Sequence, residues 1–190
     1  MDRSIDFITR GVADKRGKPF YLQLWPCDVH DGHHPSPESL ARFAGKGRSK
    51  DDRKFFAVLD ELDKELGRLF AAIDKLGIAE NTLIVLTGDN GPTVWPSYYK
   101  RGVEPPGSTG GDRGRKWSLY EGGIRQPLIV RWKGRVPAGR VNESSIIHFH
   151  GCKRFAFQRW KHTRQLERRC ALSQMRKRLT LHLYQRPFAS

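Results

Sequence analysis

Polar side chains that directly follow two apolar segments are the first candidates for chemistry. Asp89 and Asn90 come shortly after the apolar segment 82–86, and His30 lies in a polar loop after the aromatic and aliphatic segment 20–25. In parallel α/β sheets, ligands bind outside the carboxyl ends of the strands. A carboxylate beside an amide oxygen supplies the hard oxygen ligands that Ca²⁺ or Mg²⁺ prefers. Asp89 and Asn90 are therefore candidate metal ligands, and His30 is a candidate site residue.

Each of these signals also has a plainer interpretation when it stands alone. Asp89 and Asn90 are followed by Gly-Pro, and all four residue types form turns. His30 could belong to a solvated loop, because its spacing to the neighbouring histidines does not define a metal site. Lys116, in a glycine-rich segment, could be one more surface lysine. On these residues alone, the alternatives stay open.

The elements that must position these residues are strands and one long helix. Apolar residues recur at three- and four-residue spacing over 55–76, which predicts an amphipathic helix ended by Gly77. The residues that could cap its start are Ser49, Asp51 and Asp52. The continuous apolar run at 82–86 is typical of a strand covered on both faces of a parallel sheet. Segments 20–25 and 127–132 are further strand candidates. We expect an α/β fold with a mainly parallel sheet flanked by helices.

The positive charge of the chain is concentrated near its end. The 190 residues contain 35 Lys and Arg against 20 Asp and Glu, a formal net charge of +15. Residues 1–150 carry 24 basic and 19 acidic side chains, a net of +5, whereas residues 151–190 carry 11 basic side chains and one acid, a net of +10. No apolar run approaches the roughly 20 residues that cross a bilayer, and the first residues lack the grading of a signal peptide. The three cysteines have neither a disulfide-framework nor a zinc-site spacing.

Four motifs in a fixed order resemble the sulfatase family, in the arylsulfatase branch of the alkaline-phosphatase-like superfamily. The motifs are Lys-Pro-Phe-Tyr-Leu at 18–22 with His30 after it, Lys-Leu-Gly-Ile-Ala-Glu-Asn-Thr at 75–82, Leu-Thr-Gly-Asp-Asn-Gly-Pro at 86–92, and Lys116 followed by Tyr-Glu-Gly-Gly-Ile-Arg-Gln-Pro at 120–127. The resemblance covers about residues 4–149. Four motifs in the same order, each attached to a matching element, are far more specific than any one of them.

The resemblance implies a role for each matching residue. Asp89 and Asn90 match a pair that ligates one divalent cation, usually Ca²⁺. Lys116 matches a lysine that contacts the sulfate oxygens, and His30 matches a histidine beside the leaving-group oxygen, where it can act as a general acid. These roles suit a sulfate ester, because cleavage develops charge on the nonbridging oxygens and on the departing oxygen. The Glu-Gly-Gly-x-Arg segment at 121–125 matches a structural turn.

The parent activity implied by the resemblance is sulfuric ester hydrolysis. Its substrate would be a small sulfate ester or a sulfated sugar, and family members are commonly exported, periplasmic or lysosomal. Residues 1–149 would form a partial alkaline-phosphatase-like domain. A phosphatase or phosphodiesterase of the same superfamily is the catalytic alternative, because the same metal geometry serves phosphate esters.

The sequence departs from the family at its nucleophile. Family members use a formylglycine made from the Cys or Ser of a Cys/Ser-x-Pro/Ala-x-Arg motif, and no cysteine or serine of this sequence begins one. The family's paired N-terminal aspartates, the other metal ligands, would lie upstream of Met1. The chain thus looks like the middle of a sulfatase domain, and we expect no sulfatase turnover by it alone.

The basic segment 150–190 has two interpretations. The family would continue after residue 149 with an Asp-x-x-Pro-Thr helix, but the sequence here becomes basic and shows no sustained period. We interpret this segment as an irregular tail that arises from a shifted reading frame. The alternative is a nucleic-acid or anionic-lipid arm, with aromatic residues among its arginines and lysines, joined to a catalytically inactive α/β domain.

Overall fold

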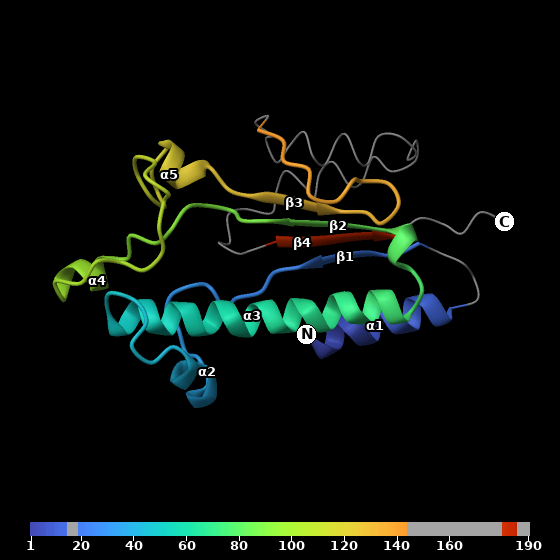
Figure 1. Cartoon of the computed structure of the whole chain (residues 1–190), viewed down its shortest axis with the longest axis horizontal. Helices are drawn as coiled ribbons and strands as arrows, with labels where there is room; N and C mark the ends of the chain where they lie inside the picture. Colours follow the sequence, from blue (N-terminus) through green and yellow to red (C-terminus); the bar gives the residue numbers. More distant parts are fainter. Residues whose placement is uncertain (15–18, 144–179, 186–190) are drawn as a thin grey trace. The chain divides into compact units, whose positions relative to one another are not determined.

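The computed structural model describes residues 1–14, 19–143 and 180–185. In chain order their elements are α1 (Asp2–Ala13), β1 (Tyr21–Leu24), α2 (Pro37–Arg42), α3 (Lys50–Lys75), the 3-10 helix η1 (Ala79–Asn81), β2 (Thr82–Thr87), α4 (Pro96–Lys100), α5 (Glu121–Ile124), β3 (Leu128–Arg131) and β4 (Thr180–Gln185) (Figure 1). All of them belong to one compact unit, Met1–Val136 with Lys177–Ser190. Residues 137–176 make a second unit, of which 137–143 are described.

The four strands form one sheet in the order β1-β4-β2-β3 (Figure 1). Every neighbouring pair is antiparallel, so the expectation of a mainly parallel sheet is wrong for the described strands. β1 and β2 do run in the same direction, but β4 lies between them and runs the opposite way. The expectation failed because it rested on burial of both faces of β2, which the structure has. Burial on both faces does not determine the direction of a strand's neighbours.

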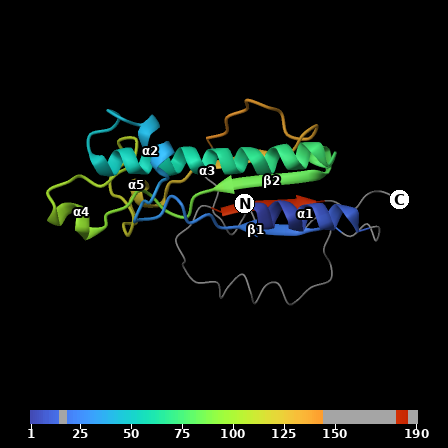
Figure 2. The ribbon, with the colours of Figure 1, turned by 90° about the horizontal axis from the view of Figure 1, so that it is seen from below.

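The long amphipathic helix is confirmed as α3, which lies with α1 along one face of the sheet (Figures 1 and 2). Its buried side chains follow the predicted three- and four-residue spacing. Ser49 is the N-cap, because its hydroxyl accepts a hydrogen bond of 3.1 Å from the Asp52 amide. Gly77 follows the last turn with φ 68°, the left-handed conformation that ends many helices. The sequence signals at both ends of this helix were therefore correct.

The hydrophobic core lies between these helices and the sheet. Its buried residues are Ile8, Phe20, Leu62, Leu66, Leu69, Ile73, Ile78, Ala79, Ile84 and Leu183. Leu69 and Ile73 of α3 and Ile8 of α1 are completely buried, as is Leu183 of the central strand β4. β4 thus contributes to the same core as the elements near the start of the chain.

The segment that we expected to be irregular contains this strand. Residues 180–185 pair with both β1 and β2, whereas residues 144–179 and 186–190 lie outside the described residues. Within the described part of the chain, no helix combines the length and apolar character needed to cross a membrane.

Candidate functional site

A cavity of about 460 Å³ lies beyond the ends of β1 and β2. Because these two strands run in the same direction, the loops that follow them emerge at the same edge of the sheet. His30 lines the cavity from the loop after β1, Asp89 and Asn90 line it from the loop after β2, and Lys116 lines it from the segment before α5. All four candidate residues of the sequence are thus brought to one cavity.

The side chains of His30 and Lys116 meet inside this cavity. Nζ of Lys116 lies 3.3 Å from Nε2 of His30, and Lys116 is buried at 8% exposure. Nδ1 of His30 lies 2.7 Å from the carbonyl oxygen of Asp31 and must donate to it. Since an ammonium has only donors, Nε2 is the acceptor in the contact with Lys116. The structure therefore directs the lone pair of Nε2 toward the lysine.

Asp89 and Asn90, whose side chains carry oxygen atoms, line the same cavity. The side-chain nitrogen Nδ2 of Asn90 donates a hydrogen bond of 2.8 Å to the Gly91 carbonyl, so the side-chain oxygen Oδ1 is the atom suited to a cation. These donors fit Ca²⁺ or Mg²⁺ in kind. Among the described residues, no group of three or more His, Cys, Asp or Glu side chains that could hold a metal ion is found.

Close backbone packing holds the cavity loops together. The amide of Gly91 donates 2.8 Å to the Gly123 carbonyl, and the amide of Lys116 donates 2.9 Å to the Pro92 carbonyl. A Cβ placed on Gly91 would lie 1.8 Å from the carbonyl oxygen of Gly122. This position therefore requires glycine. The loop with Asp89 and the loop with Lys116 pack against each other at the Glu-Gly-Gly-x-Arg segment.

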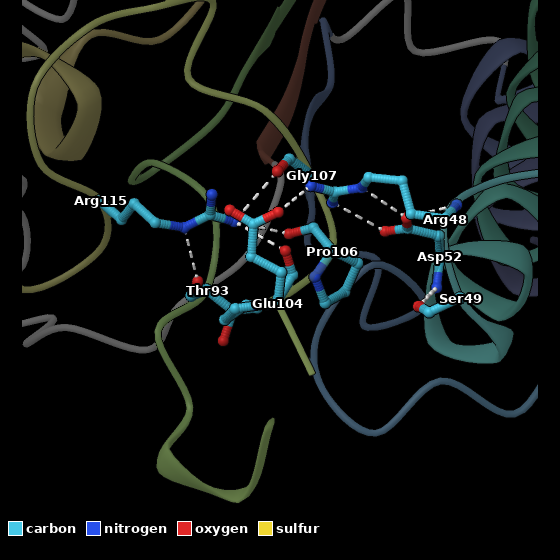
Figure 3. Close-up of polar contacts among 9 residues, drawn as sticks. Arg48, Ser49, Asp52, Thr93, Glu104, Pro106, Gly107 and Arg115 are labelled. Carbon is cyan, nitrogen blue, oxygen red and sulfur yellow. Dashed lines mark hydrogen bonds and ion pairs between the residues drawn. The ribbon is translucent and has the colours of Figure 1, made fainter. Parts of the chain in front are cut away.

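Arg115, which precedes Lys116, was not identified from the sequence. Its Nε donates 2.9 Å to the Thr93 carbonyl. Its Nη2 lies 2.7 Å from the carbonyl oxygen of Pro106, 3.0 Å from that of Gly107 and 3.3 Å from that of Pro105 (Figure 3). Partners that are backbone carbonyls leave no residue-type pattern, so the sequence carries no signal for this role.

A second arginine holds the other end of the same loop. Arg48 forms hydrogen bonds with both carboxylate oxygens of Asp52 and also pairs with Glu104 (Figure 3). Asp52 is buried at 2% exposure. The hydrogen bond from the Arg48 side chain, stronger in effect than burial, lowers the pKa of the Asp52 carboxyl below its ordinary value.

Asp31 connects the His30 loop to α4. Its carboxylate accepts hydrogen bonds from the hydroxyls of Thr93 and Tyr98, the latter at 2.7 Å. Burial, followed by the bond to Asp31, raises the pKa of the Tyr98 hydroxyl, which therefore stays a donor. Sequence reasoning did not single out Asp31, and its only signal was its place beside His30.

His33 also lines the cavity and is buried at 6% exposure. Its ring packs against Phe55, with 5.3 Å between ring centroids. Burial lowers the pKa of the His33 imidazole, partly offset by its contact with the Val29 carbonyl. The residue is therefore a neutral member of the wall, which α3 completes with Phe55, Leu59 and Leu62.

Comparison with known proteins relates this chain to one family. The family model Sulfatase matches residues 1–150. The chain is similar to steryl-sulfatase of Rattus norvegicus (38% identity, covering 73% of this chain and 22% of that protein). It is similar to arylsulfatase A of Homo sapiens (35% identity, 69% and 23%). It is also similar to N-acetylgalactosamine-6-O-sulfatase of Bacteroides thetaiotaomicron (35% identity, 66% and 24%). The chain spans less than a quarter of the length of these relatives.

A solved structure resembles the fold. The crystal structure of Ps i-CgsB in complex with k-i-k-neocarrahexaose matches with a TM-score of 0.55 and 23% sequence identity. The match covers 73% of this chain and 28% of that one. It supports a partial α/β domain.

Proposed function

The chain belongs to the sulfatase family, and from this we propose that its cavity is the sulfate-ester site of a sulfuric ester hydrolase domain. One observation supports the proposal above the others: His30, Asp89, Asn90 and Lys116, which lie in three separate segments, line one cavity. The proposed substrates are small sulfate esters or sulfated sugars.

Lys116 and His30 would act on different oxygens of the ester. Cleavage develops negative charge on the nonbridging sulfate oxygens, which the Lys116 ammonium stabilises, and on the bridging oxygen, to which His30 donates a proton. Nε2 of His30 accepts from Lys116 in this structure. A sulfate group at this site would accept a hydrogen bond from Lys116, and His30 would act as the acid in the form that carries a proton on Nε2.

Asp89 and Asn90 would hold the divalent cation through a carboxylate and an amide oxygen. Such a cation, when bound, stabilises negative charge on the sulfate. Ca²⁺ takes about six to eight oxygen ligands, so two side chains bind it weakly. We propose that this chain by itself contains an incomplete cation site.

We also propose that the 190-residue chain has no sulfatase turnover. None of its cysteines or serines begins a Cys/Ser-x-Pro/Ala-x-Arg motif, so it has no formylglycine precursor. Binding of the ester needs Lys116 and His30 but not the nucleophile. The two properties can therefore be measured separately.

The test measures both with the purified chain. Incubation with 4-nitrophenyl sulfate should release no nitrophenol, and calorimetric titration should detect binding that Lys116→Ala weakens by about tenfold or more, through loss of a charge-assisted contact. Lys133→Ala, at an exposed position, is the matched control. Turnover that His30→Ala abolishes would show that the inactivity proposal is wrong. Equal binding by the wild type and Lys116→Ala would contradict the site assignment.

The same titration addresses the catalytic alternative. A phosphatase or phosphodiesterase site should bind 4-nitrophenyl phosphate more tightly than the sulfate ester, because a dianion gains more from the same cations. The nucleic-acid arm concerns residues that lie largely outside the described part of the chain. It predicts retention on heparin that falls steeply with salt and disappears on truncation at Gly151.

A further inference from the structure

The segment 104–107, which we call the Glu-Pro-Pro-Gly wall, cannot hold itself in place by ordinary backbone pairing. Pro105 and Pro106 have no amide hydrogen to donate, and both are buried. Gly107 has φ 84°, a conformation that favours glycine. Pro106 and Gly107 nevertheless line the cavity. Buried carbonyls need donors, and among the described residues no backbone amide outside the helices and strands donates to the carbonyls of 105–107, which leaves side chains as their donors.

Arg115 supplies them. A guanidinium carries five donors in a rigid plane, and this one donates to three successive carbonyls of the wall and to the Thr93 carbonyl (Figure 3). The other arginine of this region acts from outside, since Arg48 pairs with Glu104 at the start of the wall. The Arg48 and Glu104 side chains are 58% and 70% exposed, so their ion pair is weak. The stronger anchor is therefore Arg115.

Contacts of Arg115 and of the neighbouring backbone also fix the backbone position of Lys116. Arg115 is tied to the Thr93 carbonyl through its side chain, and the Lys116 amide is tied to the Pro92 carbonyl. Two successive residues are thus held against two successive residues of the loop after β2. This arrangement sets the backbone from which the Lys116 side chain reaches within 3.3 Å of Nε2 of His30.

We propose that Arg115 is the positioning residue for Lys116 and for the Glu-Pro-Pro-Gly wall. It touches no substrate and acts by holding backbone carbonyls. The proposal rests on the proposed function, in which Lys116 binds the sulfate. Lysine should replace Arg115 only in part, because a single ammonium cannot reach Thr93 and the wall in the same planar arrangement.

The experiment uses the full chain with inorganic sulfate as the probe. Arg115→Ala should weaken sulfate binding in calorimetry by about tenfold, and Arg115→Lys should restore only part of it. Arg113→Ala is the matched control. Arg113 is an exposed residue of the same loop, and its guanidinium stacks on Tyr120, 4.0 Å from the ring centroid. This variant should bind sulfate as tightly as the wild type does. In a Lys116→Ala background, Arg115→Ala should weaken sulfate binding less than it does in the wild type, because the part of its effect that acts through Lys116 is already lost.

Hydrogen exchange separates this proposal from the proposed function. In Arg115→Ala, amides at 103–104, 107–109 and 113–118 should exchange faster while those of α3 stay protected. If the wild type does not bind sulfate, the proposed function fails, and exchange alone then decides: local loosening supports positioning by Arg115, and unchanged exchange overturns it. Wild-type sulfate affinity in Arg115→Ala also overturns it. If Arg115→Ala does not fold, Arg115→Lys provides the same comparison.

Discussion

Nζ of Lys116 lies 3.3 Å from Nε2 of His30, although 86 positions of the chain separate the two residues. Two loops at one edge of the sheet bring them together, and a third loop contributes Asp89 and Asn90 to the same cavity. The contact needs close packing of the loop backbones as well as the right side chains. Changes to that packing should therefore affect the cavity as strongly as changes to the residues that line it.

Gly91→Ala should destabilise the fold and weaken sulfate binding. The new Cβ would lie 1.8 Å from the Gly122 carbonyl oxygen, so the two loops must separate, at a cost of about 1–3 kcal/mol or more. Gly67→Ala is the control, because nothing lies within 4 Å of its Cβ position in α3. It should stabilise the helix by up to about 1 kcal/mol. Urea unfolding measures both, and equal stability of the two variants would contradict this prediction.

Asp52→Asn should lower the free energy of unfolding by about 1–3 kcal/mol at neutral pH. The substitution removes the negative charge of a buried carboxylate that accepts hydrogen bonds from the Arg48 side chain. The folded-state pKa of Asp52 is depressed below 3.8. Its stabilisation is therefore present above that pH and is lost as the pH falls through the folded pKa. The free energy of unfolding of the variant should therefore fall less than that of the wild type as the pH is lowered. Asp63→Asn, exposed on α3, should leave both quantities as in the wild type.

His33 should make the fold less stable in mild acid. Burial depresses its folded-state pKa below 6.5, so the neutral ring stabilises the native state above about pH 6.5, and this contribution is lost as the pH falls through the folded pKa. Urea unfolding at pH 7 and pH 5 should show that the free energy of unfolding falls less between these pH values in His33→Gln than in the wild type. His34→Gln, at an exposed position, should retain the wild-type difference. Identical losses in His33→Gln and the wild type would refute the prediction.

Leu183→Ala should cost about 2–5 kcal/mol, the usual range for a buried leucine. Leu183 is completely buried and lies on the strand that pairs with both β1 and β2. Leu119→Ala, at a position that is 91% exposed, should change stability by less than about 0.5 kcal/mol. Thermal melts compare the two. A wild-type melting temperature for Leu183→Ala would mean that β4 does not form part of the core.

Local patterns predicted the long helix α3, three of the four described strands and four residues of the cavity. The spacing over 55–76 defines α3 because a helix repeats every 3.6 residues, and Ser49 and Gly77 act within one turn of its ends. The motif residues were found because their types stand in a recognisable order. Arg115 and Asp31 were missed because their partners lie in other loops, and those partners include backbone carbonyls that any residue carries.

By itself, the sequence determined the helix α3, the strands β1, β2 and β3, and membership of four candidate residues in motifs of one family. Only the tertiary structure decided that β4 enters between β1 and β2, that neighbouring strands are antiparallel, and that Arg115 holds the wall beside Lys116. The physical reason is the sequence separation over which each interaction acts. Periodicity and capping act between residues a few positions apart, whereas strand order and the donors of buried carbonyls depend on segments that meet only in the folded chain.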